Sequence, residues 1–134
     1  MVRAENPFQL LYVSQLAPGC TWEVVKEIVA AARKHNAAHG ITGALLFDGE
    51  RFCQLIEGAE SKVRALANNI WADPRHTALR LLFAGLSPIG QTTQRWVSGY
   101  CDAHELEGLD VEADTSDPRT LDGFLAVLQG ADVE

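Results

Sequence analysis

Apolar residues recur along this chain at two spacings, and these predict an alternation of strands and helices. Short apolar or alternating runs indicate strands, whereas apolar residues three or four positions apart indicate amphipathic helices. The predicted strands are Phe8–Ser14, the two runs that flank Asp48-Gly49, Leu79–Ala84 and Arg95–Cys101, and the predicted helices are Thr21–Asn36 and Glu60–Ala72. The order β-α-β-β-α-β plus one strand is typical of a ferredoxin-like α+β sandwich, a mixed five-stranded sheet with two helices on one face.

The end of the chain is expected to cover the other face of that sheet. His104–Thr115 is acidic and predicted to be irregular, whereas Asp117-Pro118 is typical of a helix start. The helix that follows ends at Gly130 and carries an apolar stripe of Leu121, Phe124, Leu125 and Leu128. A lone short helix is unstable in water, so this stripe must pack on the sheet or on another chain. We expect a domain over residues 1–102 and a helical extension over residues 103–134 that caps the sheet or supports oligomerisation.

Composition and charge narrow the classes of partner. The chain has 134 residues, and its net charge of −7 disfavours nucleic acid and anionic membranes, which bind basic surfaces. No apolar run is long enough to span a bilayer, and the first seven residues lack the apolar segment of a secretory leader. We expect a cytoplasmic protein whose cysteines, Cys20, Cys53 and Cys101, are buried or free thiols. No histidine stands at metal-ligand spacing with them, so no metal site is expected.

Gln54 is the first residue whose polarity conflicts with its position. Period two places it between Phe52 and Ile56 on one face of the second hairpin strand. A two-residue turn at Asp48-Gly49 would set Gln54 opposite Gly43. A buried primary amide must find hydrogen-bond partners or cost about 1–3 kcal/mol. The missing side chain at Gly43 would leave room for a ligand that supplies those partners.

Two other polar residues share apolar faces of the predicted elements. Tyr12 lies on the strand face of Phe8 and Leu10, and Asn36 continues the apolar stripe of the first helix. Each polar residue alone has an ordinary structural explanation: a tyrosine bonded to a backbone carbonyl, an asparagine that ends a helix, or a solvated glutamine. Together with Gln54 they offer a phenol and two amides with little charge, which suits a neutral, planar, hydrogen-bonding ligand between the two helices.

Two further groups carry weaker signals. Asp73-Pro74-Arg75-His76 stops the second helix, and its charged groups either face solvent or lie near the ligand, with Asp73 orienting one of them. Trp96 on the last strand is typical of core or interface packing.

These residues, in this order and spacing, resemble the BLUF family of blue-light sensors that use a flavin. The resemblance covers Phe8–His76 and is carried by Tyr12-Val13-Ser14, His35-Asn36, Gly40-Ile41-Thr42-Gly43-Ala44-Leu45-Leu46, Phe52-Cys53-Gln54-Leu55-Ile56-Glu57-Gly58 and Asp73-Pro74-Arg75-His76. It implies a domain that holds FAD, or FMN, non-covalently between its two helices. By position, Tyr12 matches the photoactive tyrosine, Gln54 the glutamine that bridges it to the flavin, and Asn36 the asparagine at the isoalloxazine edge. The cofactor-binding residues so implied are Tyr12, Arg33, His35, Asn36, Ile41, Gln54, Asn69, Asp73, Arg75 and His76, with Asn69 where some relatives carry an arginine near the phosphates.

The resemblance also implies a mechanism that leaves no lasting covalent change. Light-excited flavin is an oxidant that takes an electron and a proton from Tyr12. Gln54 has a donor and an acceptor on one amide, so it could relay the proton and return rotated or tautomerised. A new hydrogen bond to the flavin would give a small, reversible red shift, and the change would reach strand five and the last helix.

The last strand departs from the family pattern. Family members carry Trp-Ser-Met after a Pro-Ile loop, whereas this chain has Pro88-Ile89 and then Trp96-Val97-Ser98-Gly99. Either Trp96 and Ser98, the expected signal relay, or Val97 and Gly99 occupy the family positions. Two extra residues also lie between His76 and the loop.

Three functions are compatible with this pattern. The favoured one is a blue-light photoreceptor that is not an enzyme, forms a homo-oligomer and acts on an unknown downstream protein. An acylphosphatase-like hydrolase on the same fold would need an arginine in the loop after the first strand, and Leu16-Ala17-Pro18-Gly19-Cys20 contains none. An interaction module that has lost light sensing would bind flavin weakly or show no photoshift, yet still associate through its tail.

Overall fold

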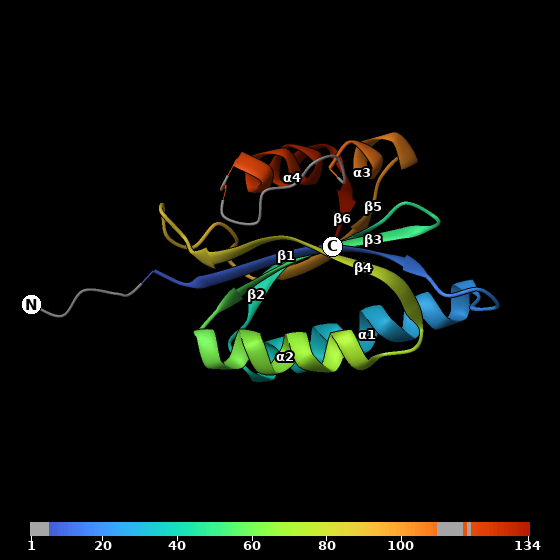
Figure 1. Cartoon of the computed structure of the whole chain (residues 1–134), viewed down its shortest axis with the longest axis horizontal. Helices are drawn as coiled ribbons and strands as arrows, with labels where there is room; N and C mark the ends of the chain where they lie inside the picture. Colours follow the sequence, from blue (N-terminus) through green and yellow to red (C-terminus); the bar gives the residue numbers. More distant parts are fainter. Residues whose placement is uncertain (1–5, 110–116, 118) are drawn as a thin grey trace, which may run out of the picture.

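A computed structural model describes residues 6–109, 117 and 119–134 of the chain. The elements are β1 (Phe8–Leu16), α1 (Trp22–Ala38), β2 (Thr42–Phe47), β3 (Arg51–Gly58), α2 (Glu60–Ala72), β4 (His76–Leu86), β5 (Trp96–Tyr100), α3 (Ala103–Leu109), α4 (Arg119–Gly130) and β6 (Asp132–Val133). The strands form one mixed sheet in the order β4-β1-β3-β2-β5-β6, with α1 and α2 on one face and α3 and α4 on the other (Figure 1). Only β2 and β5 pair in parallel in this sheet. The predicted α+β sandwich is confirmed.

Two elements differ from the sequence prediction. The sheet has six strands rather than five, because the chain after α4 adds β6 to the edge of β5. The segment predicted as irregular begins with the helix α3. Its Leu106 is fully buried and fixes the helix to the core, although the acidic composition of the segment did not indicate a helix. Asp117 begins α4 as predicted, since its Oδ1 accepts a hydrogen bond from the backbone N–H of Arg119 at 2.9 Å. Pro118 and residues 110–115 lie outside the described residues.

The predicted register of the β2–β3 hairpin is wrong by two residues. Phe47 pairs with Phe52, so four residues, the last of them Arg51 of β3, lie between the last paired positions instead of two. The Asp48 carboxylate lengthens this connection, because Oδ1 accepts hydrogen bonds from the backbone N–H groups of Glu50 and Arg51 at 2.9 and 2.6 Å.

Gly43 consequently lies opposite Ile56, and Gln54 lies opposite Leu45. The backbone of Gly43 has φ +134°, and a Cβ there would overlap the Leu55 carbonyl oxygen. Gly43 therefore serves the close approach of β2 to β3, and it leaves no gap for a ligand.

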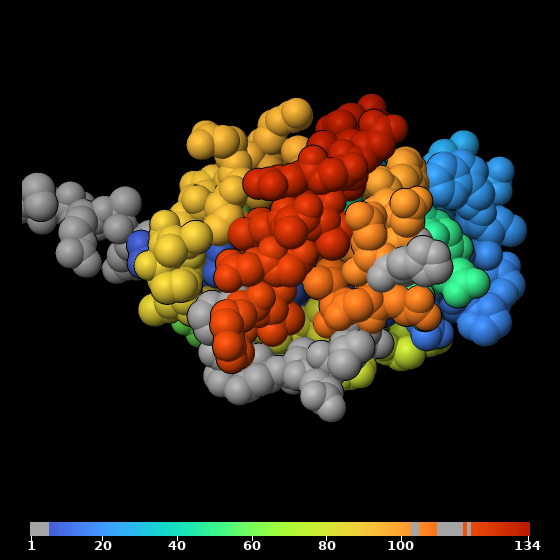
Figure 2. All heavy atoms as spheres, turned by 90° about the horizontal axis from the view of Figure 1, so that it is seen from above, coloured from blue at the N-terminus to red at the C-terminus, as the bar shows by residue number. Residues whose placement is uncertain are grey.

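Alternation along the strands divides the core between the two faces of the sheet. On the helix-bearing face, apolar residues of β1, β2, β3 and β5 pack under α1 and α2. On the other face, Leu106 of α3 and Leu121 and Phe124 of α4 pack on strand residues that include Leu11 and Leu55. Figure 2 shows α4 and α3 lying side by side across that face. The predicted burial of the α4 stripe on the sheet is confirmed, and it leaves the opposite face to form the site.

Strand β4 carries two residues more than β1 over their paired length, since Phe8–Leu16 pairs with His76–Leu86. They are accommodated by two register shifts, between Leu11 and Tyr12 and between Val13 and Gln15 of β1. Ala78, in the second irregular stretch, has a positive φ of 53°. The two additional residues of β4 thus bulge within the edge strand and leave the central strands regular.

A buried carboxylate, Glu57, ties β3 to the loop before β5. Its two oxygens accept hydrogen bonds from the backbone N–H and hydroxyl groups of Thr92 and Thr93, at 2.7–3.3 Å. Gln9 Nε2 donates a further hydrogen bond at 2.8 Å, although Gln9 Oε1 is buried without a partner. Since Glu57 is 1% exposed, these donors replace the water that an ionised carboxylate requires.

Across the part of the chain that the structure describes, no helix is long and apolar enough to cross a membrane. Within the same residues no cluster of three metal-ligating side chains occurs, and Cys20, Cys53 and Cys101 form no disulfide.

Candidate functional site

A cavity of about 240 Å³ opens between α1 and α2 above the central strands. Both helices, three strands and the start of β4 contribute to its wall, so it forms only when the sandwich is assembled. The lining residues are Tyr12, Ile28, Ala31, Ala32, His35, Asn36, Leu45, Phe52, Gln54, Leu66, Asn69, Ile70, Asp73, Arg75 and His76.

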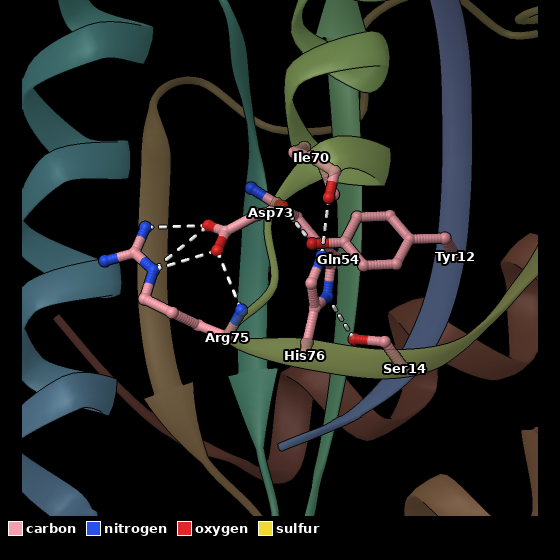
Figure 3. Close-up of polar contacts among 7 residues, drawn as sticks. All are labelled: Tyr12, Ser14, Gln54, Ile70, Asp73, Arg75 and His76. Atoms are coloured by element: carbon pink, nitrogen blue, oxygen red, sulfur yellow. Dashed lines mark hydrogen bonds and ion pairs between the residues drawn. The ribbon is translucent and has the colours of Figure 1, made fainter. Parts of the chain in front are cut away.

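Tyr12 and Gln54 form a hydrogen-bonded pair at the base of this cavity. They are cross-strand neighbours on β1 and β3, and the Tyr12 hydroxyl donates to Gln54 Oε1 at 2.7 Å (Figure 3). Both side chains are buried. Burial raises the pKa of the Tyr12 hydroxyl far above its usual value, and the nearby Cys53 and Asp73 raise it further. Tyr12 is therefore a neutral donor throughout the ordinary pH range, and the amide nitrogen of Gln54 is left for a ligand.

Asn36, at the last turn of α1, is the least satisfied polar group of the cavity. Its side chain is fully buried, and neither Oδ1 nor Nδ2 has a hydrogen-bond partner. Unpaired buried polar atoms of this kind cost about 1–3 kcal/mol each. A ligand with an adjacent donor and acceptor would satisfy both, so the cavity fits a planar molecule with such an edge.

Three residues after α2 form a rigid end to the cavity. The Asp73 carboxylate accepts hydrogen bonds from Arg75 Nε at 3.0 and 3.1 Å and from Nη2 at 2.7 Å. These hydrogen bonds are the main reason why the pKa of Asp73 lies below its usual range and why the pKa of Arg75 is raised. His76 Nε2 lies 2.6 Å from the Ile70 carbonyl oxygen, so in the neutral ring this nitrogen carries the proton and Nδ1 accepts from the Ser14 hydroxyl at 2.8 Å (Figure 3).

The cavity brings together eight of the ten cofactor-binding residues that the sequence suggested. Asn69 and His35 lie on its two helical walls. The His35 ring stacks on His39 with centroids 4.1 Å apart, and burial and then the charge of His39 lower its pKa. Arg33 and Ile41 do not line the cavity: Arg33 reaches β5, and Ile41 is buried in the apolar cluster beneath α2.

The structure also places the residues of β5. Trp96 packs with Val25 and Leu45 on the α1 side, whereas Val97 packs against the cluster on the opposite face. Arg33 Nη2 donates to the Ser98 hydroxyl at 2.8 Å, so Ser98 is on the α1 side as well. Trp96 Nε1 is buried without an acceptor.

Sequence reasoning did not assign the apolar walls to the site. Ile28, Leu66 and Ile70 belong to the helix stripes that also build the core, and Phe52 belongs to the alternating pattern of β3. Periodicity shows which residues face inward, but it does not separate core from cavity wall.

Comparison with known proteins gives one family and several relatives. The sequence model of the family described as BLUF, sensors of blue-light using FAD, matches residues 8–93. Over 79 residues the chain is 34% identical to the blue light- and temperature-regulated antirepressor BluF of Escherichia coli (strain K12), a match that covers 59% of this chain and 20% of that protein.

Two solved structures show the same similarity. The dark-state structure of BlrB, a BLUF protein, has a TM-score of 0.73 and 26% identity, covering 94% of this chain and 97% of that one. Klebsiella pneumoniae BlrP1 with FMN and cyclic diGMP has a TM-score of 0.61 and 28% identity, covering 93% of this chain and 30% of that one. The chain thus spans a fifth of the curated relative's length and nearly all of BlrB.

Proposed function

This chain belongs to the BLUF family of blue-light sensors that use FAD, and on that premise we propose that it is a photoreceptor switched by Tyr12 and Gln54. The observation that carries the proposal is the buried amide of Asn36, which lines the cavity with both polar atoms unpaired. A flavin ring carries adjacent donor and acceptor groups on its edge and would pair both atoms. The neighbouring Gln54 amide nitrogen offers a further donor.

The cavity residues divide into polar and apolar contributors. Asn36 and Gln54 would hold the ring by hydrogen bonds, and Ile28 and Ile70 would contact its faces from the two helices. Arg75, oriented by Asp73, is the cation of the cavity wall and would suit the ribityl or phosphate end. We propose FAD as the cofactor; the FMN in the BlrP1 structure makes FMN the alternative, and chromatography of the extracted flavin would distinguish them.

When bound, the flavin supplies blue-light absorption and, once excited, a strong oxidant. Tyr12 keeps its proton in the dark, because burial raises its pKa, so it releases that proton only upon oxidation. The proton has one short path, the 2.7 Å hydrogen bond to Gln54 Oε1. Tyr12 would lose an electron together with this proton, and both would return to it as the flavin relaxes, so that only the Gln54 amide would be left changed, either turned over or as its tautomer. The two arrangements of the pair differ in which amide atom faces the cavity.

The test is the absorption spectrum before and after blue light. Purified protein should carry a flavin, shift its absorption to the red under blue light and recover in darkness. Tyr12→Phe should keep the flavin and lose the shift, because it removes the hydroxyl that donates the proton to Gln54. Tyr100→Phe is the matched control, since Tyr100 is the other tyrosine and lies outside the cavity on β5.

A protein that takes up no added flavin would refute the proposal. A protein that binds flavin without a photoshift would instead be an interaction module. A normal photocycle in Tyr12→Phe would refute the role given to Tyr12 alone. Homo-oligomerisation and a downstream partner protein stay predictions, to be checked by light scattering in the dark and under illumination.

A further inference from the structure

One row of cross-strand neighbours connects the cavity to the last strand of the sheet. Tyr12 on β1 pairs with Gln54 on β3, and Gln54 pairs with Leu45 on β2. Leu45 pairs with Ser98 on β5, and Ser98 exchanges two backbone hydrogen bonds with Glu134, at 2.9 and 3.1 Å. Directly opposed residues lie on the same face of a sheet, so this row runs along the helix-bearing face.

Arg33 of α1 joins the last two members of the row. Its Nη2 donates to the Ser98 hydroxyl at 2.8 Å and lies 3.5 Å from the Glu134 carbonyl oxygen. The guanidinium also lies over the Trp96 ring, 5.8 Å from the centroid. The preceding residue Ala32 lines the cavity, so one turn of α1 touches both the cavity and the end of the row.

Gly99 adapts β5 to receive β6 closely. It pairs with Val133, and a Cβ at Gly99 would overlap the Asp132 carbonyl oxygen and contact the Val133 side chain. Its φ is not in the left-handed region, so the glycine serves this close approach and not a turn.

The strand held in this way is short and therefore easily released. β6 has two residues, both exposed, and the ladder continues only through Glu134. An edge strand with so few hydrogen bonds opens at a free-energy cost far below that of global unfolding.

We propose that β6 is a latch on the edge of β5 whose hold is set from the cavity, through the Gln54–Leu45–Ser98 row and through Arg33. A change in the Gln54 side chain shifts Leu45 and Ser98, weakens the Arg33–Ser98 hydrogen bond and frees residues 132–134. The light dependence of the latch rests on the proposed photoreceptor function, whereas its hold in the dark does not.

The experiment has a dark arm and a light arm. In the dark arm, the rates of fast amide hydrogen exchange at Ser98 and Glu134 are measured by NMR in the full chain. Arg33→Ala and Ser98→Ala each remove the side-chain hydrogen bond and should speed exchange of the Glu134 amide by about five- to tenfold. Lys34→Ala is the matched control, because it removes a cation from the next exposed position of α1 and should leave the rate unchanged. Core amides such as that of Leu55 should be unaffected in all three. Equal rates in Arg33→Ala and Lys34→Ala would overturn the latch.

Gly99→Val gives a second dark measurement. The new side chain should exclude β6, so exchange at Glu134 becomes that of a free chain, and adding Arg33→Ala should change it no further. An additive effect of the two substitutions would count against Arg33 acting through β6.

The light arm repeats the measurement under blue light while the absorption spectrum is recorded. Faster exchange at Ser98 and Glu134 in the wild type, but not in Tyr12→Phe, supports coupling to the cavity. A red shift with unchanged exchange would overturn the coupling and leave the photoreceptor function intact. Absence of any red shift would refute the photoreceptor function and, with it, the light coupling, while the dark arm would still decide whether Arg33 holds β6.

Discussion

Replacing Asn36 by leucine should change apoprotein stability and flavin affinity in opposite directions. Asn36 buries two polar atoms without partners in the flavin-free chain. Each such atom costs about 1–3 kcal/mol, and because the cavity lies alongside, the lower end of that range applies. Asn36→Leu should therefore stabilise the apoprotein by about 2 kcal/mol, which for a chain of this size raises Tm by about 8 °C.

The same substitution would remove the two hydrogen bonds that we propose Asn36 makes to the flavin. At about 1 kcal/mol each, their loss should weaken flavin binding by about 30-fold. The assay pairs denaturant unfolding of the flavin-free protein with a fluorescence titration of flavin. Asn68→Leu is the matched control, because Asn68 lies exposed on α2; it should alter stability by less than about 0.5 kcal/mol and leave affinity unchanged. A less stable apoprotein, or an unchanged flavin affinity, would refute the assignment of Asn36 as a ligand-directed residue.

Three further substitutions test the supports of the fold. Glu57→Gln should destabilise the protein by about 3 kcal/mol in denaturant unfolding, because an amide cannot accept all the hydrogen bonds from Thr92 and Thr93, whereas Glu50→Gln at the exposed turn should be neutral. Gly43→Ala should cost about 3 kcal/mol or more, and Gly90→Ala, with a positive φ but open space around it, only about 1 kcal/mol. The Asp73 carboxylate has a lowered pKa in the folded protein, so its contribution is present above the unfolded pKa near 3.8 and lost as the pH falls through the folded value. Lowering the pH from 5 to 3 should thus reduce the free energy of unfolding more in the wild type than in Asp73→Asn. The difference should be under about 1 kcal/mol, because the ion pair is partly exposed, and an equal pH dependence in the two proteins would contradict this.

The sequence predicts those elements whose bounds follow from the local spacing of apolar residues. The α2 boundaries, Glu60 and Ala72, are those expected from the apolar stripe and the proline that follows. Register depends on single side chains, and the Asp48 carboxylate displaced the β2–β3 pairing by two residues by bonding two backbone amides. A dipeptide such as Asp-Gly indicates a hairpin without specifying how its aspartate will bond.

Residues whose partners are distant in sequence were beyond local reasoning. Glu57 reads as one more strand residue, because its donors at Thr92 and Thr93 lie 35 and 36 positions away. Tyr12 and Gln54 were recognised for a different reason: their polarity conflicts with the apolar face that their own strands define. A polar residue on an apolar face can be recognised from the local sequence pattern. A buried polar residue at a position where the pattern allows polarity cannot, because its hydrogen-bond donors lie far away in the sequence.

The position of Arg33 shows how the departures of β5 from its family pattern fit together. Trp96 and Ser98 both lie on the α1 side of β5, and if Trp96 matches the family tryptophan, Ser98 stands where the resemblance expects methionine. A thioether cannot accept a strong hydrogen bond from a guanidinium, whereas the Ser98 hydroxyl accepts one from Arg33 at 2.8 Å. Gly99, the next residue, admits the close approach of β6. Ser98 and Gly99 thus both serve contacts at the edge that receives β6, and a Ser98→Met variant should lose the Arg33 hydrogen bond. If β6 is the latch we propose, exchange at Glu134 in that variant should match Ser98→Ala and not the wild type.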